Sequence, residues 1–174
     1  QGNRRFKGFL RRKGEEKNTM NRKIRFMRID DRLIHGQVIV GWVPALNVQY
    51  LVVANERVVN DPMRQEMMSL SVPQGVSLQF LSPADILKES AFTEETLVLV
   101  VSPKDAWICL QSGLTPEKLN VGGMHARAGK EELMDALHVD AEDREYFKKI
   151  LDSGMVTEFQ PTPQNEAVSM SDIL

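Results

Sequence analysis

The chain contains 174 residues, of which 42% are hydrophobic and 26% are charged, a composition typical of one globular domain with its own core. It has no run of about 18 apolar residues, so neither a membrane-spanning helix nor a signal peptide is expected. Its single cysteine, Cys109, excludes an internal disulfide and agrees with a reducing cytoplasm.

The net charge of -2 conceals an uneven distribution of charged residues. Residues 1–20 hold seven of the 22 basic residues and only two of the 24 acidic ones, so the rest of the chain is acidic. A basic arm could bind nucleic acid or an anionic membrane surface, but this one lacks a regular apolar stripe. We therefore interpret residues 1–20 as a basic extension outside the core and expect no nucleic-acid partner.

The first predicted elements are a strand and a helix on either side of a charged turn. Apolar residues between 24 and 29 predict a short strand, and those between 38 and 46 recur at roughly helical spacing. His35 lies just before this helix. Free backbone N–H groups and the helix dipole favour an anion at such a position.

Strand-like and helix-like segments alternate along the rest of the chain. Asp61-Pro62, Ser82-Pro83 and Ser102-Pro103 each combine an N-cap residue with a proline suited to the first helical position. The repeated order of strand, cap and helix predicts an α/β fold of three layers, α/β/α, with a mainly parallel central sheet, and leaves open an antiparallel edge strand at the C-terminus. The predicted strands are 50–54, 76–81, 96–101 and 118–121, and the predicted helices are 61–70, 82–90 and 102–113.

Ligands of such folds bind outside the carboxyl ends of the strands, where the strand order reverses. The loops expected to meet there include the one that carries His35. They begin near Asp30, Asn55, Leu81 and Ser102, with Gly122-Gly123 as a further neighbouring loop.

The segment 28–38, Arg-Ile-Asp-Asp-Arg-Leu-Ile-His-Gly-Gln-Val, carries more chemistry than a chain reversal needs. A lone histidine in a turn is usually solvated or caps a helix, and Gly36 alone would suffice to turn the chain. Here Asp30 and Arg32 accompany His35. An aspartate can orient an imidazole, and an arginine can hold phosphate oxygens in a bidentate fork. The cluster predicts a site that receives and holds a phosphoryl group.

The same segment resembles the active-site signature of the enzyme IIB component of the mannose/fructose/sorbose family of the bacterial phosphoenolpyruvate:sugar phosphotransferase system. The residues at 51–56, 120–124 and 137–140 resemble further parts of this family. The resemblance extends from about residue 22 to about residue 163. It implies a IIB phosphocarrier domain at 21–163 and leaves 164–174 as a C-terminal tail.

The resemblance implies a phosphoryl relay. A phosphohistidine on the IIA protein or domain would donate to His35, which would pass the group to a hexose or amino sugar held by the membrane components IIC and IID. The intermediate would be a covalent phosphohistidine without a cofactor, on a cytoplasmic protein peripherally associated with the transporter. A homodimer is compatible with the resemblance. The family suggests that Nδ1 carries the phosphate, whereas the sequence alone does not choose between the two nitrogens.

The residues of the motif receive roles from this resemblance. His35 would be the nucleophile, Arg32 and Arg28 would neutralise the phosphoryl oxygens, and Asp30 would orient the ring or pair with Arg32. The remaining candidates, which would offer backbone N–H groups at the helix start, are Gly36 and Gln37.

The other potentially reactive side chains, one cysteine and two histidines, also fit ordinary structural positions. Cys109 lies among apolar residues of a predicted helix, so we expect a buried thiol and not the cysteine phosphocarrier of other IIB families. His125 either approaches the phosphate or a partner or is a surface loop residue, and His138 fits a half-buried strand position. No histidine pair has metal-ligand spacing with a carboxylate, so no metal is expected.

Two other classes of protein fit the same features. A regulatory IIB-like protein, phosphorylated but without a dedicated transporter, would keep His35 and Arg32. A non-catalytic module of flavodoxin-like architecture would use the same sheet edge to bind a small anion.

Overall fold

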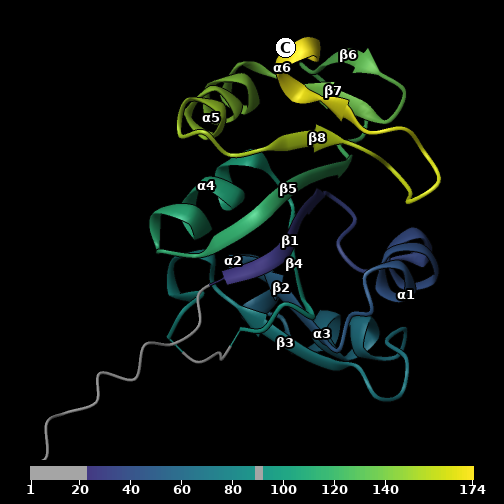
Figure 1. The fold of residues 1–174 in the computed structure, drawn as a ribbon. Helices are drawn as coiled ribbons and strands as arrows, with labels where there is room; N and C mark the ends of the chain where they lie inside the picture. The colour runs from purple at the N-terminus through teal and green to yellow at the C-terminus, as the bar shows by residue number, and fades with distance from the viewer. Residues whose placement is uncertain (1–22, 89–91) are drawn as a thin grey trace, which may run out of the picture.

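The computed structural model describes residues 23–88 and 92–174, so the basic extension at 1–20 lies outside the described residues. Its centre is a seven-stranded sheet of order β3-β2-β4-β1-β5-β8-β9 (Figure 1). All neighbouring strands run parallel except β8 and β9, which confirms the predicted parallel sheet with an antiparallel C-terminal edge. The strands are β1 (Lys23–Asp30), β2 (Tyr50–Ala54), β3 (Ser77–Leu81), β4 (Thr96–Val100), β5 (Thr115–Gly123), β8 (Thr157–Phe159) and β9 (Val168–Ser169).

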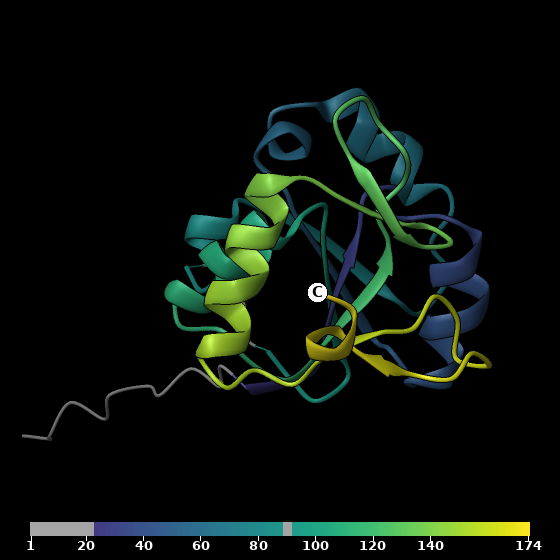
Figure 2. The same ribbon diagram turned by 90° about the horizontal axis from the view of Figure 1, so that it is seen from above.

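Helices cover both faces of this sheet, as the predicted three layers require (Figures 1 and 2). On one face lie α4 (Pro103–Gln111) and α5 (Ala141–Asp152). The other face is covered by the π-helix η1 (Gln37–Trp42) and by α1 (Val43–Ala45), α2 (Glu56–Val59) and α3 (Pro62–Ser69). No helix among the described residues has the length and apolar character needed to cross a membrane. The remaining elements are the short 3-10 helix η2 (Pro83–Asp85), the hairpin strands β6 (Glu131–Met134) and β7 (Leu137–Val139), and the helix α6 (Met170–Ile173).

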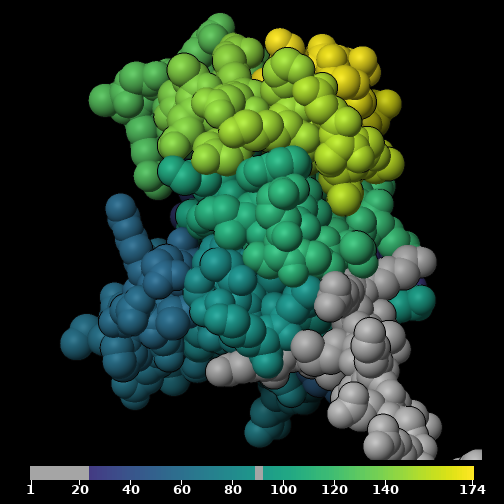
Figure 3. All heavy atoms as spheres, turned by 90° about the vertical axis from the view of Figure 1, so that its left-hand side faces the viewer, coloured from purple at the N-terminus to yellow at the C-terminus, as the bar shows by residue number. Residues whose placement is uncertain are grey.

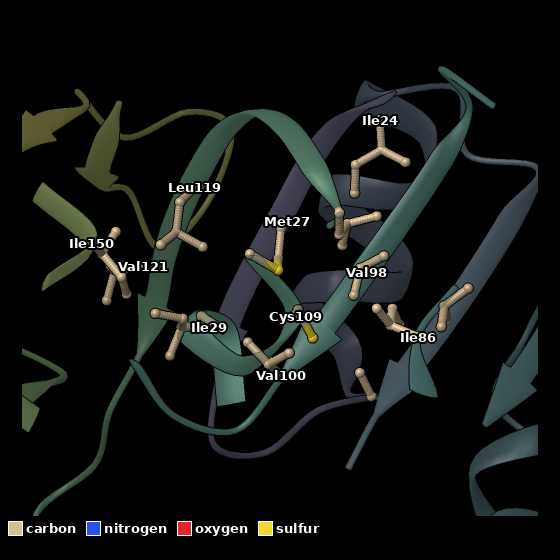
Figure 4. Packing of buried hydrophobic residues seen from close by; sticks show 14 of the residues in the cluster. Ile24, Met27, Ile29, Ile86, Val98, Val100, Cys109, Leu119, Val121 and Ile150 are labelled. Carbon is tan, nitrogen blue, oxygen red and sulfur yellow. The ribbon is translucent and has the colours of Figure 1, made fainter. Parts of the chain in front are cut away.

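The core consists of two layers separated by the sheet. Every residue of β4 is buried, because this central strand has a covered face on each side. Leu97 and Leu99 pack toward η1, α2 and α3, whereas Val98 and Val100 pack toward α4 and α5. This alternation follows from the period of two in a strand. Figure 4 shows the second layer, with Cys109 of α4 beside Val98 and Val100.

Two of the three predicted helix starts have the expected cap geometry. The Asp61 side chain accepts a hydrogen bond from the Arg64 N–H at 3.0 Å, and the Ser102 hydroxyl accepts one from the Asp105 N–H at 3.2 Å. The third prediction was wrong, because residues 82–88 form only the short η2 followed by turns. The Ser82 side chain makes no cap hydrogen bond, so nothing closes the first turn of a longer helix there.

The strand predicted at 118–121 is longer than expected. It runs from Thr115 to Gly123, and Gly123 still pairs with Asp30 of β1. Gly122 and Gly123 are therefore the last residues of β5 and not a separate loop. The glycine pair belongs to the sheet edge on which His35 lies.

The strand order places a topological switch point at β1. From β1 the chain continues to β2, toward the β3 edge of the sheet, whereas from β4 and β5 it continues toward the β9 edge. The connections after β1 and β4 thus leave in opposite directions, which opens a crevice at the carboxyl ends of the central strands. Three of the loops predicted to meet there, after β1, β2 and β4, line this edge.

Residues 164–174, set apart as a tail by the sequence, contribute β9 and α6. Val168 pairs with Phe159 of β8, and Met170 is fully buried in the core layer that contains Phe147 and Ile150. The tail is part of the packed structure.

Met170→Ala should therefore lower the free energy of unfolding by about 3 kcal/mol, because it leaves a cavity in a closed core. Leu174→Ala removes an apolar side chain that is 38% exposed, and should change stability by less than about 0.5 kcal/mol. Urea denaturation of both variants makes the comparison. If Met170→Ala were as stable as Leu174→Ala, the buried side chain of Met170 would contribute nothing to the core.

Candidate functional site

The site is built around the carboxylate of Asp30, the last residue of β1. His35 Nε2 lies 2.8 Å from Asp30 Oδ2, and the two side chains are 15% and 0% exposed. His35 precedes η1, whose first hydrogen bonds run from Val38 and Ile39 to the His35 carbonyl. The strand end and the helix start thus bring the predicted histidine and aspartate into contact. Among the described residues, no hydrogen bond engages His35 Nδ1.

Arg28 lies beneath this pair as a fully buried side chain. Two positions before Asp30 on the same strand, it points to the same side of the sheet and donates from Nη2 to Asp30 Oδ2 at 2.9 Å. It also donates to Asn120 Oδ1 at 2.5 Å, and its guanidinium lies 5.4 Å from the Trp42 ring centre. Its other acceptors are the carbonyl oxygens of Gln160 and Pro161. The sequence did not anticipate these partners, which fix Arg28 below the surface.

Arg32 contacts the other carboxylate oxygen of Asp30. Its Nε lies 3.3 Å from Asp30 Oδ1, its Nη2 donates to Gln37 Oε1 at 2.9 Å, and its side chain is 38% exposed. Between Arg32 and His35, the buried Leu33 has a φ of 59°, a left-handed conformation that costs a non-glycine residue about 1 kcal/mol. The chain reverses through this strained residue before His35 contacts the same carboxylate as Arg32.

These contacts decide the charge of Asp30. Burial alone would raise its pKa, but the hydrogen bond to His35 and the charges of Arg28 and Arg32 together lower the pKa from 3.8 to about 2. Asp30 is therefore ionised at neutral pH. An ionised acceptor at Nε2 favours the His35 tautomer with its proton on Nε2, which leaves a lone pair on Nδ1.

The glycine pair at the end of β5 makes room for the cluster. A Cβ atom on Gly122 would overlap the Arg28 guanidinium. A Cβ atom on Gly123 would lie 3.1 Å from His125 Cε1 and 3.4 Å from Arg32 Nη2. The glycines therefore act by having no side chain, a role different from the loop contact predicted for them.

A second histidine–aspartate pair lies beside the first. His125 Nδ1 is 2.6 Å from Asp31 Oδ1, and the His125 N–H donates to Asp31 Oδ2 at 2.9 Å. The His125 side chain is 42% exposed. The sequence signal for this proximity was that His125 follows the Gly122-Gly123 pair, which the structure places at the end of β5 beside β1.

Asn55 and Ser102 have different surroundings from His35. Asn55 caps α2 through bonds from the Arg57 and Val58 N–H groups, and Ser102 caps α4. Both line a cleft beside Asp31, and no hydrogen bond joins either to the His35 cluster within the described ranges. The predicted site residues thus divide into a His35 cluster and a neighbouring cleft.

The side chains given structural interpretations fit them. Cys109 is fully buried, and burial raises the pKa of its thiol far above the neutral range, which disfavours a nucleophilic thiolate. His138 lies on β7 with its ring 3.2 Å from the Met124 carbonyl and its side chain 16% exposed.

Fold and site together define an α/β protein with a histidine held by a buried carboxylate at the switch point of a parallel sheet. Comparison with known proteins narrows this class. Residues 24–174 match the family model described as PTS system sorbose subfamily IIB component. The chain belongs to this family, so it is a phosphotransferase-system IIB component of the mannose/fructose/sorbose group, as the resemblance implied.

Relatives agree over nearly the whole domain. The chain is 31% identical to the N-acetylgalactosamine-specific phosphotransferase enzyme IIB component 2 of Escherichia coli K12, over 84% of this chain and 96% of that protein. It is also 31% identical to the mannose-specific EIIAB component of the same organism, over 84% of this chain but only 47% of that longer protein. The crystal structure of the IIBSor domain of the sorbose permease from Klebsiella pneumoniae superimposes with a TM-score of 0.79 at 30% identity, covering 86% and 94% of the two chains.

The close approach of Gly122 to Arg28 predicts an unequal response to alanine. Gly122→Ala should lower the free energy of unfolding by about 3 kcal/mol or more, because it displaces a buried ionic side chain. Gly36→Ala is the control, since a Cβ there meets nothing within 4 Å and the backbone is already helical. It should change stability by less than about 1 kcal/mol. Chemical denaturation of the two variants tests this difference, and equal losses would contradict the packing described for Arg28.

The lowered pKa of Asp30 predicts how stability depends on pH. A carboxyl group with a depressed pKa in the folded state stabilises the protein above its unfolded value of 3.8 and loses this contribution as pH falls through about 2. Wild-type stability should fall by roughly 2 kcal/mol from this group over that window. Asp30→Asn, which removes the carboxylate partner of Arg28, should be less stable at neutral pH and should lack this component. Denaturation curves at a series of pH values measure it, and parallel pH profiles for the two proteins would contradict it.

Proposed function

We propose that His35 is the phosphoryl carrier of this IIB component. It would accept the group from a phosphohistidine of a IIA protein or domain and pass it to a hexose or amino sugar during uptake through the membrane components IIC and IID. The observation that supports this most strongly is the contact between His35 Nε2 and the buried Asp30 carboxylate, with no hydrogen bond to Nδ1 among the described residues. Nδ1 is then the nitrogen that attacks phosphorus.

The phosphoryl group is transferred in two displacement steps, first to His35 and then to the sugar. The Nδ1 lone pair forms a P–N bond while the P–N bond of the donor histidine breaks and its electrons return to the donor ring. In the second step a sugar hydroxyl oxygen forms a P–O bond while the P–N bond to Nδ1 breaks and its electrons return to the His35 ring, and the hydroxyl proton passes to water. Asp30 keeps its hydrogen bond to the Nε2 proton throughout and stabilises the positive charge of the phosphorylated ring.

In this proposal Arg28 and Arg32 have different roles, because only Arg32 is exposed at the surface. Arg32, which is partly exposed, would contact the phosphoryl oxygens, with help from the N–H groups of Gly36 and Gln37 at the start of η1. Arg28 is fully buried and bonded to Asp30, so we assign it a positioning role. Because Arg28 and Arg32 both bind Asp30, the carboxylate is held ionised and does not take the ring proton.

The test is phosphorylation with phosphoenolpyruvate, the upstream phosphotransferase proteins and a IIA partner. Wild type should acquire acid-labile, alkali-stable phosphate, and His35→Ala should acquire none. His125→Ala, His138→Ala and Cys109→Ser are matched controls that should keep the label. Circular dichroism establishes that each variant is folded.

Two results would contradict the proposal. Label that persists in His35→Ala would assign the carrier role to another residue. Coupling of phosphorus to Nε2 in an NMR spectrum of the phosphorylated protein would contradict the assignment to Nδ1.

A further inference from the structure

Beside the His35 cluster lies a cleft whose walls carry more positive than negative charge. The cleft has a volume of about 250 Å³. In Figure 3 the surface is notched between the blue atoms around α2 and the green atoms that follow β5. The charged residues that line it are Arg57, Arg64, Arg127, Lys130 and Asp31. We call it the cationic cleft.

Two of these positive charges have no carboxylate partner in the described part of the chain. Lys130 bonds Asp143 at 2.5 Å, and Arg127 lies 3.7 Å from Asp31. The exposed guanidinium groups of Arg57 and Arg64, by contrast, pair with no carboxylate within residues 23–88 and 92–174. They come from α2 and α3, so two separate elements bring charge to one place. An excess of two positive charges over a concave surface attracts a dianion.

We propose that the cationic cleft binds a small phosphate monoester. Such an ester carries about -1.5 to -2 charges at neutral pH, which matches the unpaired charge of Arg57 and Arg64. Guanidinium groups suit its oxygens, because their N–H groups form forked bonds to phosphate.

The polar atoms of the cleft suit the rest of such an ester. The Ser102 hydroxyl oxygen accepts from the Asp105 N–H, so its own proton is free to donate to a ligand. Asn55 lines the cleft beside it. The volume is below the roughly 300 to 1,000 Å³ of pockets for drug-sized ligands. A phosphorylated sugar therefore fits the cleft better than a nucleotide.

The cleft is distinct from the His35 cluster although it shares its sheet edge. Asp30 contacts Arg28, Arg32 and His35, whereas Asp31 contacts His125 and Arg127. The side chains of these consecutive residues therefore serve two different groups of partners. Binding in the cleft does not require phosphorylation of His35.

The experiment titrates the protein with inorganic phosphate, a hexose phosphate and the unphosphorylated hexose, followed by calorimetry and by backbone amide shifts. The hexose phosphate should bind and shift the amides of Arg57 and Ser102, and the free hexose should not. The double variant Arg57→Gln/Arg64→Gln should weaken binding by about tenfold or more. Arg25→Gln is the matched control, because Arg25 is an exposed arginine at the start of β1, at the opposite end of the strands, and its loss should leave binding unchanged.

The outcomes separate this inference from the role proposed for His35. Tighter binding of hexose phosphate than of inorganic phosphate would identify a free phosphate ester as the ligand of the cleft. Equal binding of the two would show that the cleft recognises the phosphoryl group alone. His35→Ala should bind as wild type does. Loss of binding in His35→Ala, unchanged binding in the double variant, or absence of binding by both phosphate compounds would overturn the inference while leaving the His35 phosphorylation test unaffected.

Discussion

The buried carboxylate of Asp30 is the constraint on which the rest of the site depends. A lone carboxylate without exposure to water would be very unfavourable, so the fold must supply donors for both of its oxygens. Arg28 reaches it because residues two apart on a strand share a face. Arg32 binds it from the turn directly after β1, and His35 contacts it after the chain has passed through the strained conformation at Leu33. Gly122, on the neighbouring strand, must lack a side chain for the Arg28 guanidinium to fit. One charge therefore determines the conformation of the loop, the identity of a residue on β5 and the orientation of the imidazole.

The balance of charges around Asp30 also suits a group that must be both accepted and released. Two guanidinium groups and one carboxylate leave the cluster with one net positive charge before His35 is counted. Of the two arginines that bind Asp30, only Arg32 reaches the surface. A phosphoryl group on Nδ1 would therefore contact one partly exposed arginine and backbone N–H groups, and would not be enclosed on all sides. Partial exposure weakens such contacts through solvent screening. A carrier gains from this arrangement, because a tightly held phosphoryl group would not be passed on.

The sequence predicted those features that depend on local pattern. The apolar runs gave the parallel strands, the Asp61 and Ser102 caps gave two helix starts, and the charged segment 28–38 gave the contact between His35 and Asp30. It did not predict features set by packing between distant segments. Arg28 is held by Asn120 and by carbonyl groups more than 100 residues away, and no local pattern indicates such partners. The Ser82-Pro83 pair had the right residues for a helix start, yet the cap bond did not form.

The consecutive residues Asp30 and Asp31 bring two different groups of side chains together at one sheet edge. At the end of a strand, neighbouring side chains point to opposite sides, so two aspartates in sequence naturally serve two surroundings. Asp30 is fully buried and holds the ring of the proposed phosphoryl carrier, whereas Asp31 lines an open cleft in which Arg57 and Arg64 pair with no carboxylate among the described residues. Because His125 binds Asp31 and lies above Gly123 next to Arg32, the two surroundings meet at one point.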